Sequence, residues 1–204
     1  KDTQAAFIRI FKEYGLPRRI RSDNGVPYAS ISRGGLSQLS LWWIKLGILP
    51  ERIEPGKPQQ NGRHERMHRT LKQATTRPPS SSMRSQQSRF NRFTEEYNEQ
   101  RPHEALEQAT PASRYTRSPR EYPKRVRDPE YPDYFQTRKV GLNGVMYWKN
   151  KMVYITHLLK DEAIGVEEVN DGVWNVYFGP VKLGHFDERA FKNEKARDYI
   201  SLKV

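Results

Sequence analysis

The sequence predicts a mixed α/β protein in which a helix-rich α/β region is followed by a small all-β domain. Up to residue 115, apolar residues recur mainly at helical spacing, whereas after residue 133 they alternate in short segments separated by hairpin turns. The stretch between the two is rich in Pro and Arg and poor in apolar residues, which is typical of a linker. We therefore expect an α/β region at 1–115, a linker at 116–133, a small β domain at 134–192 and a tail at 193–204.

The first 22 residues predict one helix and one strand. Apolar residues from Phe7 to Tyr14 follow helical spacing, and Gly15 with Pro17 ends the helix. Residues 18–22 then have the composition of a short strand, which stops before an Asn-Gly turn.

A second helix and strand follow, and then a third helix. Leucines and a tryptophan on one face predict a helix at 35–46, which Gly47 ends. We expect a strand at 48–53, a loop rich in Pro and Gly at 54–62, and a helix at 63–75. The remaining elements expected in this region are a polar loop at 77–88 and a helix at 89–98.

The C-terminal third has the pattern of a small β domain. Asn143-Gly144 and Asp171-Gly172 are strong hairpin turns, and residues 149–151 form a third candidate turn. Five short strands separated by such turns are typical of a small barrel of the SH3-like kind. The expected strands are 145–148, 152–156, 164–169, 173–178 and 181–186.

The charge of the chain is positive and unevenly distributed. The chain has 36 Lys and Arg against 24 Asp and Glu, a net charge of +12. Residues 57–127 hold 16 of the basic and 7 of the acidic residues, so 16 − 7 = 9 of the 12 excess charges lie there. A concentrated positive field attracts polyanions, and release of their counterions favours binding. This segment therefore predicts contact with nucleic acid.

Composition excludes several other classes of protein. The absence of cysteine excludes disulfides, cysteine-ligated zinc fingers and iron–sulfur sites. The sequence also lacks a run of about 18 apolar residues, so we expect no membrane partner and a cytoplasmic protein.

Two carboxylates are candidates for metal chemistry because of their positions. Asp23 falls at the carboxyl end of a predicted strand, where sites gather in α/β sheets. At about 100° per residue, Glu65 shares one helix face with His68, Arg69 and Lys72. The simpler interpretations are an ordinary turn at Asp23 and an ion pair between Glu65 and Arg69. The apolar residues on the opposite face can pack against a sheet; they are Met67, Leu71 and Ala74.

Three segments, in order, resemble the catalytic core of bacterial insertion-sequence transposases. They are 16–28 (LPRRIRSDNGVPY), 47–72 (GILPERIEPGKPQQNGRHERMHRTLK) and 97–115 (YNEQRPHEALEQATPASRY). These enzymes belong to the retroviral-integrase superfamily, which uses an Asp, Asp, Glu triad. The resemblance implies a partial RNase H-like integrase core followed by a small SH3-like β-barrel. It also implies metal-dependent DNA cleavage and strand transfer, with DNA and further copies of the chain as partners at the bacterial nucleoid.

The same resemblance implies which residues act. Asp23 takes the second and Glu65 the third triad position, both as ligands of Mg²⁺ or Mn²⁺ in a two-metal site. The first aspartate should lie on a strand well upstream, and residues 1–204 contain no such strand. We therefore expect an N-terminally truncated core that is inactive alone. The residues that lie where such enzymes meet DNA, or on the face of the glutamate, are Lys57, Gln59, Gln60, Arg66, Arg69 and Lys72.

Two alternatives to an active transposase remain open at this point: a non-catalytic remnant and a zinc metalloprotease. The chain is either part of an active transposase or a non-catalytic DNA-binding and oligomerising remnant, and the sequence upstream of Lys1 discriminates between them. A more distant alternative is a zinc metalloprotease, because residues 64–68 (HERMH) fit the H-E-x-x-H signature. The sequence offers no clear third zinc ligand for this alternative.

Overall fold

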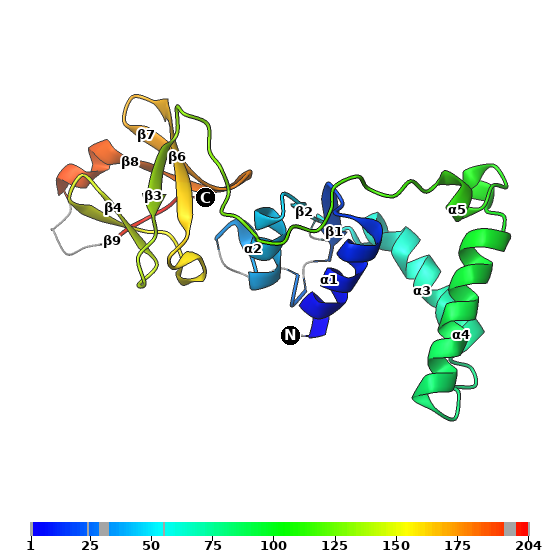
Figure 1. The fold of residues 1–204 in the computed structure, drawn as a ribbon. Helices are drawn as coiled ribbons and strands as arrows, with labels where there is room; N and C mark the ends of the chain where they lie inside the picture. The colour runs from blue at the N-terminus through cyan, green and yellow to red at the C-terminus, as the bar shows by residue number, and fades with distance from the viewer. Residues whose placement is uncertain (1, 24, 29–32, 55, 194–198, 204) are drawn as a thin grey trace. The chain divides into compact units, whose positions relative to one another are not determined.

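The computed structural model describes residues 2–23, 25–28, 33–54, 56–193 and 199–203 (Figure 1). Contacts divide the chain into two compact units, each of which is described by itself. The first unit comprises Lys1–Arg52 and Pro119–Val204, and the second comprises Ile53–Ser118. This division differs from the linear order expected from the sequence, because residues 119–133 and the β strands share one unit with the first 52 residues. The linear domain boundaries stay a prediction.

The first unit begins with the helices and strands that the periodicity predicts. Helix α1 (Asp2–Tyr14) leads to strand β1 (Arg19–Ser22), and helix α2 (Gln38–Lys45) leads to strand β2 (Leu49–Arg52). β1 and β2 pair in parallel. A single turn of 3-10 helix, η1 (Arg33–Gly35), precedes α2, so α2 itself begins three residues later than expected. The side chain of Ser37 caps α2 by accepting a hydrogen bond from the Ser40 amide at 3.2 Å.

An aromatic core holds α1 and α2 together. Trp43 of α2 is 0% exposed, and the Phe7 ring of α1 meets it edge-on at 5.2 Å between ring centroids. Burial of such large apolar rings is the main favourable term in folding. The buried members of this core are Phe11, Leu16, Leu39, Trp43, Leu46 and Ile48.

The strands of the first unit from β3 onward form two further sheets. The strand order is β3-β6-β7-β8 in one sheet and β4-β5-β9 in the other. Among the described strands these pairings do not close into a single barrel, so the expected SH3-like barrel is not confirmed. The strands are β3 (Gln136–Lys139), β4 (Val145–Trp148), β5 (Lys151–Tyr154), β6 (Ala163–Asn170), β7 (Val173–Phe178), β8 (Val181–Asp187) and β9 (Tyr199–Ser201).

Two features of these sheets were not expected from the sequence. β3 lies before the first predicted strand, and β9 lies within the segment expected to be a tail. β9 pairs in parallel with β5, and the adjacent Leu202 is buried in the core between the sheets. The predicted hairpin turns are present, since Gly144 and Gly172 both have positive φ, at 76° and 69°.

Helix α2 belongs to two cores at once. Trp43 faces the aromatic core, whereas Leu41 and Ile44 join the buried cluster between the two β sheets. An ion pair of 2.6 Å between Lys45 and Glu162 reinforces this contact. Burial alone would lower the pKa of the Lys45 amine, but its hydrogen bonds to Glu162 and Asp128 outweigh that effect and raise the pKa. The β strands are therefore not packed independently of the N-terminal helices.

The segment expected to be a linker is an ordered strap on the first unit. We define the strap as residues 119–131, which have no regular helix or strand. Arg120 donates hydrogen bonds to the carbonyls of Pro17, Leu46 and Gly47 at 2.8–2.9 Å. The segment lacks helix and strand, as the sequence predicts. Unlike a flexible linker, however, it is hydrogen-bonded to the rest of the first unit.

The far end of the strap is fixed by a tyrosine. The Tyr131 hydroxyl donates to the carbonyl of Ala163 at 3.0 Å and accepts from the amide of Gly179 at 3.1 Å. Burial raises the pKa of this phenol to about 12, so the donor proton is present at neutral pH. A β-carbon at Gly165 would lie 2.3 Å from the Tyr131 ring, so only glycine permits this approach.

Arg120→Ala is expected to lower the free energy of unfolding of the chain by about 2 kcal/mol, because three carbonyls lose a charged donor. Urea unfolding followed by tryptophan fluorescence measures the change. Arg120→Lys is the matched control and should recover only part of the loss, since an ammonium lacks the planar fork that reaches several carbonyls. An unchanged unfolding midpoint in the alanine variant would contradict the strap contacts.

The second unit consists of helices. Helix α3 (Gly62–Thr75) confirms the helix expected at 63–75, and α4 (Met83–Glu95) packs against it. α4 begins inside the segment expected to be a polar loop, because Ser82 and Ser85 form a capping box. Gln86 of α4 donates to the carbonyl of Thr75 at 2.9 Å. The other elements are η2 (Pro58–Asn61), η3 (Glu96–Gln100), η4 (Glu104–Leu106) and α5 (Pro111–Arg114).

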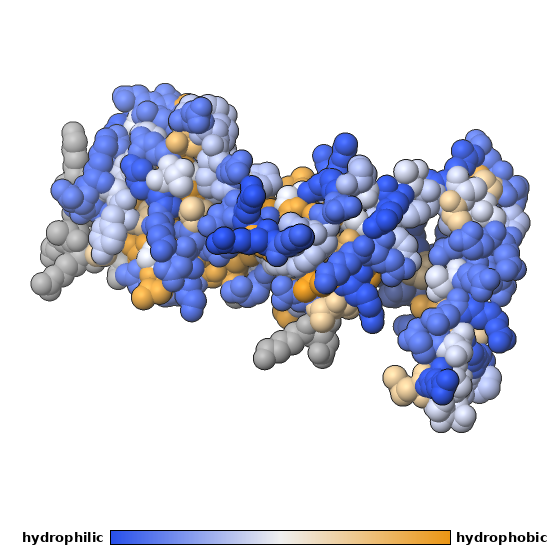
Figure 2. Space-filling model, in the orientation of Figure 1, coloured by the Kyte–Doolittle hydropathy of each residue, from blue (hydrophilic) through white to orange (hydrophobic). Residues whose placement is uncertain are grey.

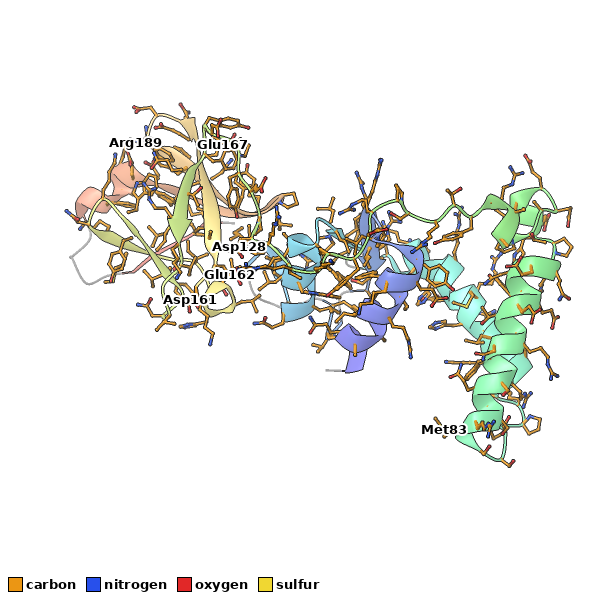
Figure 3. All side chains as sticks on the ribbon, in the orientation of Figure 1. Met83, Asp128, Asp161, Glu162, Glu167 and Arg189 are labelled. Carbon is orange, nitrogen blue, oxygen red and sulfur yellow. The ribbon has the colours of Figure 1, made fainter. Side chains whose placement is uncertain are left out.

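The second unit buries little of its own surface. Thr75 is its only buried residue among those the structure describes there. Met83, the first residue of α4 and labelled in Figure 3, is 87% exposed. Within this unit α3 packs on α4, so the sheet expected to cover Met67, Leu71 and Ala74 is not among its elements.

No helix in the described part of the chain has the length and hydropathy needed to cross a membrane.

Candidate active site

Asp23 lies where the sequence predicts, immediately after β1. Because β1 and β2 run parallel, their carboxyl ends lie at one edge of the two-stranded sheet. The Asp23 carboxylate is exposed, and its Oδ1 accepts a hydrogen bond from the Gly25 amide at 3.0 Å. This turn holds the carboxylate beyond the strand end. Asn24, in the same turn, lies outside the described residues.

Glu65 lies in the first turn of α3 and is exposed. A carboxylate is favoured at this position because it faces the positive end of the helix dipole. Among the ion pairs of the described residues, none joins Glu65 to Arg69, so the simple helix pair does not account for the glutamate.

The helix face that carries Glu65 is basic and open to solvent. Arg69 and Lys72 on this face, and Arg66 about 100° from Glu65 around the helix axis, are all exposed, whereas Met67 and Leu71 on the other side are half-buried. The part of the chain that the structure describes offers these three cations no acidic partner. Three unpaired cations beside one carboxylate suit a substrate that carries several phosphates.

The comparison with known families covers this helix. Residues 46–111 match the family model of the integrase core domain, a segment that begins at the end of α2 and ends at α5. The match supports a member of the integrase and transposase superfamily. The matched segment contains Glu65 but not Asp23, so the role of Asp23 rests on the sequence pattern and on its position after β1.

The integrase segment also contains a loop whose polar residues are tied to one another. The Gln60 amide donates to the Glu54 carboxylate at 2.8 Å, and Lys57 forms an ion pair with the same group. Hydrogen bonds from Lys57 and then Gln60 lower the pKa of Glu54. Lys57 and Gln60 therefore hold the loop before α3, while Gln59 is exposed. Sequence reasoning missed Glu54, although its i,i+3 spacing from Lys57 is a signal for an ion pair.

The zinc-protease alternative finds no support in the described residues of either unit. His64 and His68 do lie together on α3, with 4.1 Å between their ring centroids. Burial, the neighbouring His64 and Lys72 lower the pKa of His68. Zinc catalysis needs a third protein ligand, and within either unit the described residues contain no group of three His, Cys, Asp or Glu that could hold a metal.

Proposed function

We propose that this chain supplies Asp23 and Glu65 to a site that cleaves and joins DNA strands with divalent metal ions. The observation that carries the proposal is Glu65, which is exposed at the start of an unpaired basic face inside the matched integrase core. Asp23 lies in the first unit and Glu65 in the second, so each is positioned by its own unit.

The donor atoms of these residues suit the metals that such chemistry uses. Mg²⁺ and Mn²⁺ prefer hard oxygen ligands, and both carboxylates are exposed to solvent. When bound, the ions stabilise charge on the attacking and leaving oxygens at phosphorus. Asp23 and Glu65 would hold them, while Arg66, Arg69 and Lys72 would bind and orient the phosphates of the DNA.

A second candidate function is DNA binding without catalysis, with DNA and further copies of the chain as partners at the nucleoid. The observation in its favour is that the described residues of each unit contain no complete metal-ligand group, although the second unit has the open basic face. The two candidates predict the same DNA affinity but differ in strand cleavage, which therefore decides between them.

Replacing Arg66, Arg69 and Lys72 together by alanine is expected to weaken duplex DNA binding and reduce its salt dependence. Each phosphate contact contributes about 0.9 to the slope of log K against log salt, so three lost contacts reduce it by up to about 2.7. Fluorescence anisotropy at several salt concentrations measures the slope. The matched control replaces three other exposed arginines of the second unit, Arg77, Arg84 and Arg92, by alanine. Equal slopes in the two variants would argue against DNA binding by the helix face that carries Glu65.

A further inference from the structure

The strap carries three cationic side chains that make no hydrogen bond or ion pair with the rest of the described structure. Lys124, Arg125 and Arg127 are exposed. Within the described ranges they have no hydrogen-bond acceptor and no acidic partner. The nearest carboxylate in sequence, Asp128, forms an ion pair with Lys45 at 3.1 Å, and Figure 3 shows it beside Glu162, the other partner of Lys45. These three positive charges within four residues therefore form no ion pair in the described part of the chain, although the exposed Glu121 lies three positions before Lys124.

The backbone that presents these cations is anchored on both sides. Arg120 ties the beginning of the strap to three carbonyls, and Tyr131 ties its end to Ala163 and Gly179. Between these anchors, Tyr122 and Val126 pack against the aromatic core. The cations thus lie among half-buried anchors on an ordered segment. Binding then requires less ordering of the chain than it would on a flexible linker.

The strap also borders a concavity of the first unit. The concavity has a volume of about 810 Å³. It is bounded by the strap and by the apolar residues Leu16 and Leu46, with Lys45 beside them. Figure 2 shows hydrophilic side chains gathered over α2 and the strap. The surface is open rather than enclosed, so it suits an extended polyanion better than a small molecule that needs a closed pocket.

We propose that the strap is a second binding site for the phosphate backbone of duplex DNA. An extended chain advances about 3.3–3.6 Å per residue, so Lys124 and Arg127 are separated by up to about 10 Å. Over an axial length of about 10 Å, each strand of duplex DNA carries about three phosphates, at one per 3.4 Å of helix axis. Arginine and lysine bind phosphate without reading the bases, so the site positions DNA rather than selecting a sequence. The inference rests on the proposed function, since it takes DNA as the substrate.

The test compares two variants of the full 204-residue chain that lose the same charge. The strap variant is K124Q/R125Q/R127Q, and the control is K139Q/K160Q/K182Q on exposed positions around the β sheets. Duplex binding by fluorescence anisotropy at several salt concentrations should show a slope lower by up to about 2.7 in the strap variant. We expect a clearly smaller decrease in the control. Thermal unfolding of both variants should match the unsubstituted chain, because none of the six side chains is buried.

The outcomes separate this proposal from the proposed function. Equal slopes in the strap variant and the control overturn the strap site, even if the unsubstituted chain binds DNA. Absence of duplex binding by the unsubstituted chain overturns both. Arg120→Lys, which keeps the charge but loosens the strap, is an independent test. Because this variant weakens the anchoring of the strap, we expect it to bind DNA more weakly. Unchanged affinity overturns the claim that anchoring of the strap favours DNA binding.

Discussion

Glu65→Gln is expected to reduce DNA strand cleavage at least about 100-fold in a version of the chain that also carries an upstream strand with the remaining triad aspartate. Loss of groups that only orient metal ligands typically costs about 10–100-fold, so loss of a ligand should cost at least as much. Glutamine keeps the size and helix propensity of glutamate but removes the charge that holds a divalent ion. The effect should therefore appear in cleavage and not in folding.

The experiment incubates labelled transposon-end DNA with the extended chain in Mn²⁺. Asp23→Asn should have the same effect as Glu65→Gln. Glu95→Gln is the matched control, because Glu95 is an exposed glutamate on α4 of the same unit. Full activity of the Glu65 variant would refute the assignment of Glu65 as a metal ligand.

The polypeptide of residues 1–204, tested as such, is expected to show no cleavage in Mg²⁺ or Mn²⁺. Asp23 and Glu65 would supply only two of the three carboxylates that the resemblance implies, so both metal affinity and positioning should be lost. Cleavage by this polypeptide that disappears on Asp23→Asn would show that two carboxylates suffice.

Trp43→Ala is expected to destabilise the chain by about 3–5 kcal/mol, the cost of removing a large buried ring and leaving a cavity. Trp43 is 0% exposed, and its ring meets Phe7 at 5.2 Å and Tyr28 at 6.1 Å between centroids. Because α2 also contributes Leu41 and Ile44 to the core between the β sheets, the loss should reach those sheets. Urea unfolding monitored by circular dichroism and by fluorescence should show coincident shifts.

Trp43→Phe is the control for this effect. The indole nitrogen of Trp43 is buried without a hydrogen-bond partner among the described residues, so phenylalanine loses volume but no hydrogen bond. Its cost should be clearly smaller than that of alanine. A destabilisation in the alanine variant of below about 1 kcal/mol would mean that the site collapses to fill the cavity.

The sequence by itself determined the elements that depend on neighbouring residues. Helical spacing predicted α1, α2 and α3, and Asn-Gly and Asp-Gly predicted the hairpin turns at Gly144 and Gly172. Asp23 and Glu65 could be placed at a strand end and in a first helical turn, because both positions follow from local periodicity. The match to the integrase core domain agrees with the motif around Glu65.

The tertiary structure decided everything that depends on residues distant in sequence. Composition made residues 116–133 resemble a free linker, but Arg120 finds its acceptors 73 or more positions away, at Pro17, Leu46 and Gly47. The strand β9 exists because β5 offers it an edge. Leu41 and Ile44 are buried in a second core whose other members, apart from Leu36, lie 96 or more positions later, from Val140 onward. Local spacing shows which residues prefer burial, but only the folded chain shows which surface buries them.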